Sequence, residues 1–269
     1  MTNNTPYPRS ITAYVHKYGL NKLIPFDDNY AERFDLKQTG VSPPDTNDVT
    51  PYPPDWFDLV RLHRLILERK VTTVLEFGVG YSTLIFAHAL RENLNQYSTF
   101  VADNIRKHNP FVVHSVDADS LFIDYTQSLL PNELKIHACF HRSSVKMAEW
   151  QGRVCTLFEE LPNICPDFIY LDAPEPSHAE GSIRNISTFH PDRFPMSADI
   201  LSIEHFFLPG TLILIDGRTA NARFLQCNLQ RKWKYHHSLK DDVHYFELKE
   251  KPLGTMNQVE LAWRFDEHN

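Results

Sequence analysis

The sequence predicts an α/β fold built on a doubly wound, mostly parallel sheet of seven strands. Segments of β-branched, apolar residues alternate with segments of helical periodicity from residue 55 onward. The last two strand-like runs are joined by only three residues, Lys240 to Asp242. Strands separated by helices favour a parallel sheet covered on both faces, whereas so short a link permits only an antiparallel hairpin.

The elements follow in order once a proline-rich segment ends. Trp56, Leu59 and Ile66 recur at three- and four-residue spacing and predict an amphipathic helix that ends near Lys70. The expected strands are 71–77, 111–117, 134–140, 167–172, 211–216, 233–239 and 243–248. The expected helices are 82–94, 120–130, 198–207 and 219–230, with 95–110 as an inserted loop or short helix.

Both ends differ in composition from this central part. Residues 1–53 are rich in proline and polar side chains, which predicts an irregular N-terminal arm with one short helix. Residues 54–250 form the α/β domain. Residues 251–269 form a C-terminal tail packed on that domain, in which 256–269 is either another strand or an irregular segment.

Composition excludes several classes of protein. The 269 residues include 27 Lys and Arg against 34 Asp and Glu, a formal net charge of −7, which argues against a broad nucleic-acid interface. No stretch approaches the 18 apolar residues of a membrane span, and the N-terminus lacks a secretory pattern. We therefore expect a cytoplasmic chain without membrane or nucleic-acid partners; its oligomeric state is not indicated.

The four cysteines form no CxxC pair. Cys139, Cys155 and Cys227 lie in apolar or strand-like contexts, and Cys165 stands between them in the sequence. This predicts buried free thiols rather than a disulfide or a zinc site.

Carboxylates follow four of the predicted strands. Glu76 ends the first strand, and Asp117, Asp172 and Asp216 end three later ones. Ligands bind outside the carboxyl ends of the strands in an open parallel sheet, so these residues mark the expected site.

Glycine is scarce, at 9 of 269 residues, and two glycines stand in the turn after the first strand. Gly78 and Gly80 give the main chain a path without a Cβ, and the helix that begins near Ser82 offers free N–H groups to an anion. The run Glu76-Phe77-Gly78-Val79-Gly80 resembles the first motif of the class I S-adenosylmethionine-dependent methyltransferases. The resemblance spans about residues 55–250.

This resemblance implies a Rossmann-like fold and S-adenosylmethionine as cofactor. It places the cofactor over the glycine turn and the helix start, with its ribose hydroxyls on Asp117; the residues implied at the turn are Glu76, Gly78, Gly80, Tyr81, Ser82 and Thr83. Ser82 stands where the family has a third glycine. Tyr81 is also compatible with simple packing.

A nicotinamide-dependent oxidoreductase is the rival with the same strand, turn and helix. Its third glycine would fall at Thr83, and its acidic residue is expected about 20 residues on, whereas Asp117 lies 37 residues beyond Gly80. The connection before Asp117 is also long for a methyltransferase.

Asp172 and Asp216 have two interpretations. In the metal-dependent O-methyltransferases, which the chain partly resembles, acidic residues at these strand ends bind magnesium, and Asp172 also lies beside the cofactor. Gly217 stands where that family has a further ligand, so magnesium is possible but not favoured. Alternatively, Asp216 caps the helix near Thr219 and Asp172 holds a turn.

The long polar loop after Asp172 is expected to bind the acceptor. Its His178 is the expected general base, because imidazole titrates near neutrality, and Arg218 could hold Asp216 or an anionic acceptor. The sequence thus predicts methyl transfer to a hydroxyl or amine of a small-molecule or saccharide acceptor. A non-catalytic nucleoside-binding or partner module of the same fold is the alternative.

Overall fold

The computed structural model describes residues 8–28, 30, 53–194 and 196–265. Its main sheet has seven strands in the order β3-β2-β1-β6-β8-β10-β9. All neighbours in this sheet are parallel except β10, which is antiparallel to both β8 and β9. The strands are β1 Thr73–Phe77, β2 Val112–Asp117, β3 Ala138–Arg142, β6 Phe168–Leu171, β8 Leu212–Asp216, β9 Trp233–Ser238 and β10 Val243–Leu248. The predicted fold class is confirmed, including the C-terminal hairpin.

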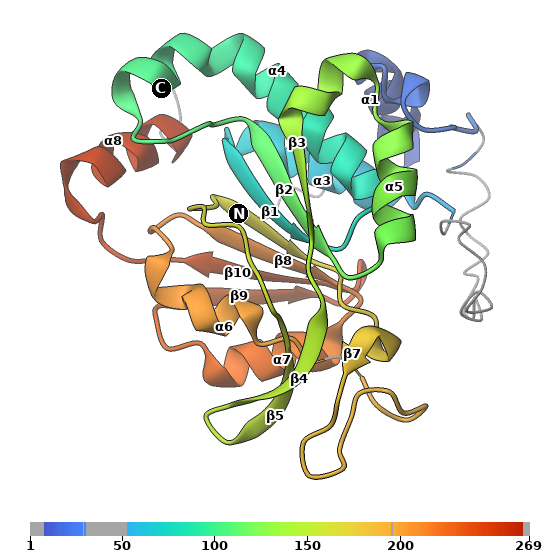
Figure 1. Cartoon of the computed structure of the whole chain (residues 1–269). Helices are drawn as coiled ribbons and strands as arrows, with labels where there is room; N and C mark the ends of the chain where they lie inside the picture. Colours follow the sequence, from blue (N-terminus) through green and yellow to red (C-terminus); the bar gives the residue numbers. More distant parts are fainter. Residues whose placement is uncertain (1–7, 29, 31–52, 195, 266–269) are drawn as a thin grey trace.

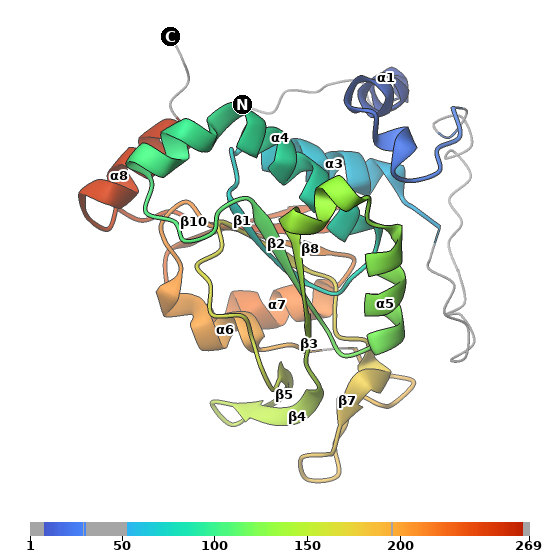
Figure 2. The same ribbon diagram turned by 45° about the horizontal axis from the view of Figure 1, so that its top comes forward.

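Helices cover both faces of this sheet (Figures 1 and 2). Helices α3 (Trp56–Glu68) and α4 (Tyr81–Asn104) lie on one face, and α6 (Asp199–Ile203) and α7 (Thr219–Asn228) lie on the other. Two separate clusters of buried apolar side chains fill the space between the sheet and its two helical layers. The central strands β1 and β6 are buried along their whole length, as expected for strands covered on both faces.

The connection between β1 and β2 corrects the expected insertion. Residues 95–104 continue α4, which runs for 24 residues, so the long interval before Asp117 is a long helix rather than a loop. Asn93 holds the middle of α4 by donating to the main-chain oxygens of Ile66 and Val71 at 3.0 and 2.9 Å. Val101, near the end of α4, is buried in the core beneath it.

Several elements between and after the predicted ones were not expected. The hairpin of β4 (Val145–Trp150) and β5 (Arg153–Phe158) pairs with the short β7 (Ala179–Glu180) in a second, three-stranded sheet. Helix α5 (Ser120–Leu129) precedes a 3-10 helix, η2 (Asn132–His137), that occupies the start of the strand expected at 134–140. Two further 3-10 turns are η3 (Pro176–His178), within the loop after β6, and η4 (Glu204–Phe206), directly after α6.

The chain termini also contribute helices to the domain. Helix α1 (Pro8–Tyr18), followed by the 3-10 turn η1 (Leu20–Lys22), buries Ile11 and Val15 in the core under α3. Residues 31–52 of the expected arm lie outside the described residues. At the other end, α8 (Gly254–Phe265) takes the place of the strand considered for this segment.

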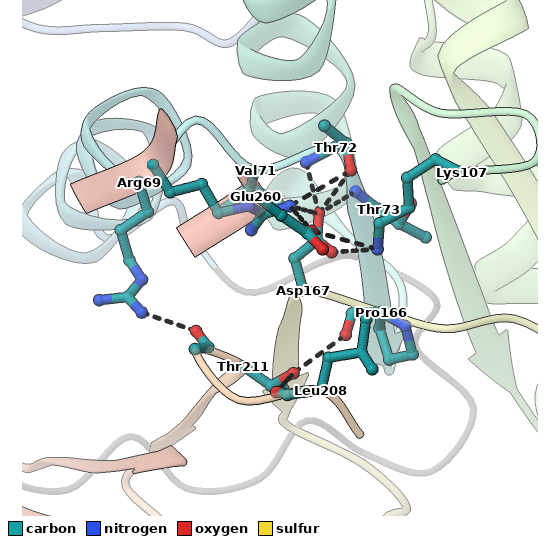
Figure 3. A network of polar contacts seen from close by, with 12 residues as sticks. Arg69, Val71, Thr72, Thr73, Lys107, Pro166, Asp167, Leu208, Thr211 and Glu260 are labelled. Atoms are coloured by element: carbon teal, nitrogen blue, oxygen red, sulfur yellow. Dashed lines mark hydrogen bonds and ion pairs between the residues drawn. The ribbon is translucent and has the colours of Figure 1, made fainter. Parts of the chain in front are cut away.

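Helix α8 is anchored by a buried ionic network around Asp167 (Figure 3). Arg264 of α8 and Lys107 both pair with the Asp167 carboxylate, and Arg264 also pairs with Glu260 at 2.9 Å. Asp167 further accepts hydrogen bonds from the main-chain N–H groups of Thr72 and Thr73 at 2.7 and 3.0 Å. The network lies at the amino ends of the parallel strands, opposite the glycine turn.

The cysteines are free, as predicted, but only Cys155 is buried. Cys139 and Cys165 are half-buried and Cys227 is exposed, which corrects the expectation of four buried thiols. Among the described residues, no helix is long and apolar enough to cross a membrane.

Candidate functional site

The glycine turn joins the buried strand β1 to helix α4. Gly78 has a φ of +107°, and a Cβ there would lie 3.4 Å from the Cβ of Ala173, so the turn passes close to the chain after β6. Gly80 has an extended main chain, and a Cβ there would meet no atom within 4 Å. The turn therefore leaves an open space at Gly80.

Glu76 lies beneath this turn rather than in the open space. Its carboxylate is fully buried and accepts hydrogen bonds from Ser82 at 2.5 Å, Thr83 at 2.7 Å and Ser115 at 2.5 Å. Burial raises the pKa of Glu76 to about 7, while the three hydroxyl donors act against that rise. Glu76 and the buried Thr83 thus hold the glycine turn in place from the side that faces the core.

A cavity of about 230 Å³ opens where the turn meets α3, α5 and the ends of β6 and β8. Of the residues expected to bind the cofactor, its wall contains Gly80, Tyr81, Ser82 and Asp172. The wall also includes Asp58 and Tyr170, together with Asp216 from the end of β8. The first turn of α4, whose first N–H groups precede the intrahelical hydrogen bonds, thus borders the same space as four carboxylates, those of Asp55, Asp58, Asp172 and Asp216.

The carboxylates at this cavity share one unfavourable electrostatic environment. Burial, together with the charges of the neighbouring Asp58 and Asp172, raises the pKa of Asp216 to about 9. Burial and the charge of Asp55 raise the pKa of Asp58 to about 6. The positive charge of Arg61, which pairs with Asp58 at 2.6 Å, acts to lower this pKa. Because Asp58 and Asp216 interact, the pair retains one proton near neutral pH.

Tyr170 and Asp55 complete this arrangement. The Tyr170 hydroxyl donates to Asp216 at 3.3 Å. Asp55 caps α3 by accepting from the N–H groups of Phe57 and Asp58, at 2.9 and 3.4 Å, and so fixes the helix turn that presents Asp58.

Asp216 does not cap helix α7. The residue before this helix is Arg218, and no side chain caps the helix there. The expected capping role of Asp216 is therefore wrong.

Arg218 joins the ends of β6 and β8. Its guanidinium donates to the main-chain oxygen of Pro174 at 2.8 Å and to the carboxylates of Asp172 and Glu175 at 3.4 and 3.2 Å. Arg218 thus holds the start of the loop after β6 rather than Asp216, and about half of the Asp172 side chain stays exposed.

A second cavity, of about 600 Å³, lies on the other side of this pair. Its wall includes Asp172 and Asp216 again, with Glu175, Phe194 and Arg218 from the loop and the start of α7. The two cavities therefore share the two carboxylates at the ends of β6 and β8.

His178 and Asp117 lie apart from this shared wall. His178, at the end of η3, lines a separate surface pocket of about 340 Å³ with Asp119, Ser120 and Arg142. Asp117 ends β2 beside this pocket; burial raises its pKa to about 6, opposed by its hydrogen bond from the Asp119 N–H at 2.9 Å and by His178. The structure thus brings together Gly80, Tyr81, Ser82, Asp172 and Asp216 but places His178 elsewhere.

Nothing in the sequence marks Asp58 or Tyr170 as site residues. Asp58 stands in an amphipathic helix, where a charged residue is usually solvated, and Tyr170 stands in an apolar strand. Two groups of potential metal ligands occur in the described residues, on β2 with β3 and on β9 with β10, and neither includes Asp172 or Asp216. Magnesium at those two residues remains a prediction.

Among known proteins, solved structures resemble the chain, whereas family models and curated proteins do not. No family model and no curated protein matches the chain. Solved structures that it resembles include an O-methyltransferase from Bacillus cereus in complex with S-adenosylhomocysteine (13% identity, 91% of this chain and 93% of that one, TM-score 0.40). Another is an O-methyltransferase of tomaymycin synthesis from Streptomyces achromogenes in complex with S-adenosylmethionine (15%, 91% and 100%, TM-score 0.41). A third is a Podospora anserina methyltransferase bound to S-adenosylhomocysteine (12%, 93% and 100%, TM-score 0.45).

The assignment of the fold depends on the strand order of the main sheet. A seven-stranded sheet in which the penultimate position is held by the one antiparallel strand is the class I methyltransferase fold that the sequence resemblance implied.

Proposed function

We propose that the chain is an S-adenosylmethionine-dependent methyltransferase that acts on a hydroxyl or amine of a small-molecule or saccharide acceptor. One observation supports this most: the cavity at the glycine turn and the cavity at the loop after β6 share Asp172 and Asp216. A cofactor in the first and an acceptor in the second would meet at these carboxylates.

The residues present fit this cofactor. The space at Gly80 is open, and the first turn of α4 offers N–H groups for a carboxylate. The four carboxylates at the same cavity suit a ligand with an ammonium and a sulfonium group, since each positive charge would be attracted to them. When bound, the cofactor supplies a methyl carbon on a positively charged sulfur, and the bond to sulfur breaks as the acceptor forms its own.

The chain supplies alignment and removal of the acceptor proton. Asp172, held by Arg218, and Asp216, held by Tyr170, border both cavities and would orient the acceptor toward the first. A cation in the first cavity would stabilise ionised Asp216, which frees this carboxylate to take the proton from a hydroxyl or amine. The geometry favours Asp216 over His178 for this role.

The test of cofactor binding is calorimetry with S-adenosylmethionine, S-adenosylhomocysteine and NADH on the wild-type chain and on Gly80→Val. Because Gly80 has an extended main chain, valine is tolerated there, but its side chain enters the cavity. We expect the wild type to bind both sulfur compounds and Gly80→Val to bind neither.

Ala102→Val is the matched control, because Ala102 is exposed on the same helix, and it should bind as the wild type does. Absence of binding of both sulfur compounds at millimolar concentrations would refute the proposal. Binding of NADH alone would support the nicotinamide-dependent oxidoreductase instead. Binding without methyl transfer to any hydroxyl or amine in a compound panel would favour the non-catalytic nucleoside-binding module.

A further inference from the structure

Three side chains with metal-binding chemistry meet at the edge of the main sheet, on its outermost strand β3 and its neighbour β2. The parallel register pairs His114 with Cys139 and Val116 with His141. Paired residues of neighbouring strands share a face, and so do residues two apart on one strand. His114, Cys139 and His141 therefore project from the same face of the sheet, while Ser115 points to the opposite face and donates to Glu76.

The ligand atoms of this group lie close enough together to bind one metal ion. Nδ1 of His114 lies 3.1 Å from Nε2 of His141, with the two ring planes inclined by only 18°. The ligand atoms of His114, Cys139 and His141 all lie within 4.8 Å of one another, and each residue is half-buried. The group is thus preassembled and still accessible from solvent.

The chemistry of the group favours a soft divalent ion. Two zinc–nitrogen bonds of about 2.0–2.1 Å in a tetrahedron set the nitrogens about 3.3 Å apart, close to the 3.1 Å between Nδ1 of His114 and Nε2 of His141. A cysteine sulfur with two imidazoles selects zinc or copper over magnesium or calcium.

A second group of potential ligands, His237, Asp242 and His244, lacks this geometry. The rings of His237 and His244 stack at 3.8 Å between centroids, so one ion cannot lie in both ring planes. Both ring nitrogens of His244 already have hydrogen-bond partners, Thr219 at 3.0 Å and Tyr235 at 2.9 Å. This group serves as an internal control.

We propose that His114, Cys139 and His141 bind one Zn²⁺ ion per chain, with a fourth position open to water. The sequence favoured free thiols over zinc because no CxxC spacing is present; the site depends instead on the register of two strands 25 residues apart. When the sulfur–zinc bond forms, the Cys139 thiol releases its proton to the buffer. The N–H between the two rings shifts to the outer nitrogen of its ring, so the imidazoles release none.

The ion would link the edge strand to its neighbour. His114 lies three residues before Asp117, the residue that the sequence resemblance places on the cofactor ribose. Zinc at this point would stabilise the edge of the sheet next to the end of β2.

The test is calorimetry with ZnCl₂ on the reduced, metal-free chain in two buffers of different ionisation enthalpy. We expect one Zn²⁺ per chain and release of about one proton for each ion bound. Cys139→Ser, which is nearly isosteric, should weaken binding at least tenfold and abolish the proton release. His141→Ala should also weaken binding at least tenfold.

Two matched variants and a second metal decide the result. Cys165→Ser, at the other half-buried thiol, and His237→Ala, in the second group, should bind Zn²⁺ as the wild type does. Co²⁺ should give a sulfur-to-metal absorption band in the wild type and not in Cys139→Ser. No Zn²⁺ binding by the wild type, unchanged binding by Cys139→Ser, or loss of binding in His237→Ala would overturn the assignment. Circular dichroism establishes that each variant is folded.

Discussion

At the scale of single residues, the candidate site depends on a few carboxylates whose neighbours change their chemistry. Asp172 and Asp216 could be predicted from the sequence, because strand ends in a parallel sheet mark the ligand edge. Asp58 could not, since its place beside Asp216 depends on how α3 packs on the sheet. The titration of imidazole near neutrality favours His178 as a base, but the path of the long loop after β6 decides where this residue lies, and sequence patterns do not specify that path.

The role of Asp216 in proton removal predicts the effect of Asp216→Asn. An amide cannot accept the acceptor proton, so kcat should fall by about 10²–10⁴-fold, while binding of S-adenosylhomocysteine, which lacks the sulfonium charge, changes little. The measurement is methyl transfer from labelled cofactor to the acceptor that a compound panel identifies.

His178→Ala and Asp103→Asn are the comparisons for this variant. Both should retain turnover, because His178 lines a different pocket and Asp103 is exposed on α4. Loss of turnover in His178→Ala with normal turnover in Asp216→Asn would show that His178, and not Asp216, is the general base.

The raised pKa of Asp216 also predicts a pH dependence of stability. With a pKa of about 9 in the folded chain against an ordinary 3.8, folding retains a proton that the unfolded chain releases. This contribution to stability is complete below about pH 4 and is lost as the pH rises through 9. Asparagine at this position resembles the protonated carboxyl and removes the dependence.

Urea unfolding of the ligand-free wild type and of Asp216→Asn between pH 6 and pH 9 tests this. The free energy of unfolding of the wild type should fall relative to the variant, by up to about 1.4 kcal/mol per pH unit. Parallel curves for the two proteins would show that Asp216 has an ordinary pKa.

At the scale of elements, the strands and helices with strong periodicity were predictable, and those fixed by tertiary contacts were not. The predicted central strands and the helices that follow them agree with the structure because their apolar patterns are continuous. The C-terminal half of α4 and helix α8 were missed because each is stabilised by packing on the other, as in the edge-to-face contact of Tyr97 with Trp263. The β4–β5 hairpin turns at Gln151 and Gly152, both with positive φ, a turn that carries little sequence signal.

The anchor of α8 predicts a large effect for Asp167→Asn. Asparagine would remove one of the two carboxylates that the buried Lys107 and Arg264 share and leave them with Glu260, which costs about 3–5 kcal/mol of unfolding free energy. Glu180→Gln is the control, because its pair with Lys146 is largely exposed and contributes little to stability. Chemical denaturation of both variants measures the difference, and equal stabilities would contradict a structural role for the network.

At the scale of the whole molecule, the fold separates two tasks at opposite ends of one sheet. The amino ends of the parallel strands contain the ionic network of Asp167 (Figure 3), whereas the carboxyl ends contain the glycine turn and the carboxylates. The mostly parallel sheet and its C-terminal antiparallel hairpin could be predicted from the alternation of strands and helices and from the short link at 240–242. The two cavities that meet at Asp172 and Asp216 could not, because they arise where α3, α5 and the loop after β6 approach one another.

The central claim is that the cavity at the glycine turn receives the sulfur of the cofactor beside Asp216. A crystal structure of the chain with S-adenosylhomocysteine tests it most directly. We predict the sulfur in the cavity bordered by Gly80, Asp172 and Asp216, with the amino-acid part at the start of α4. A ligand bound outside this cavity, or a sulfur remote from Asp216, would contradict the account.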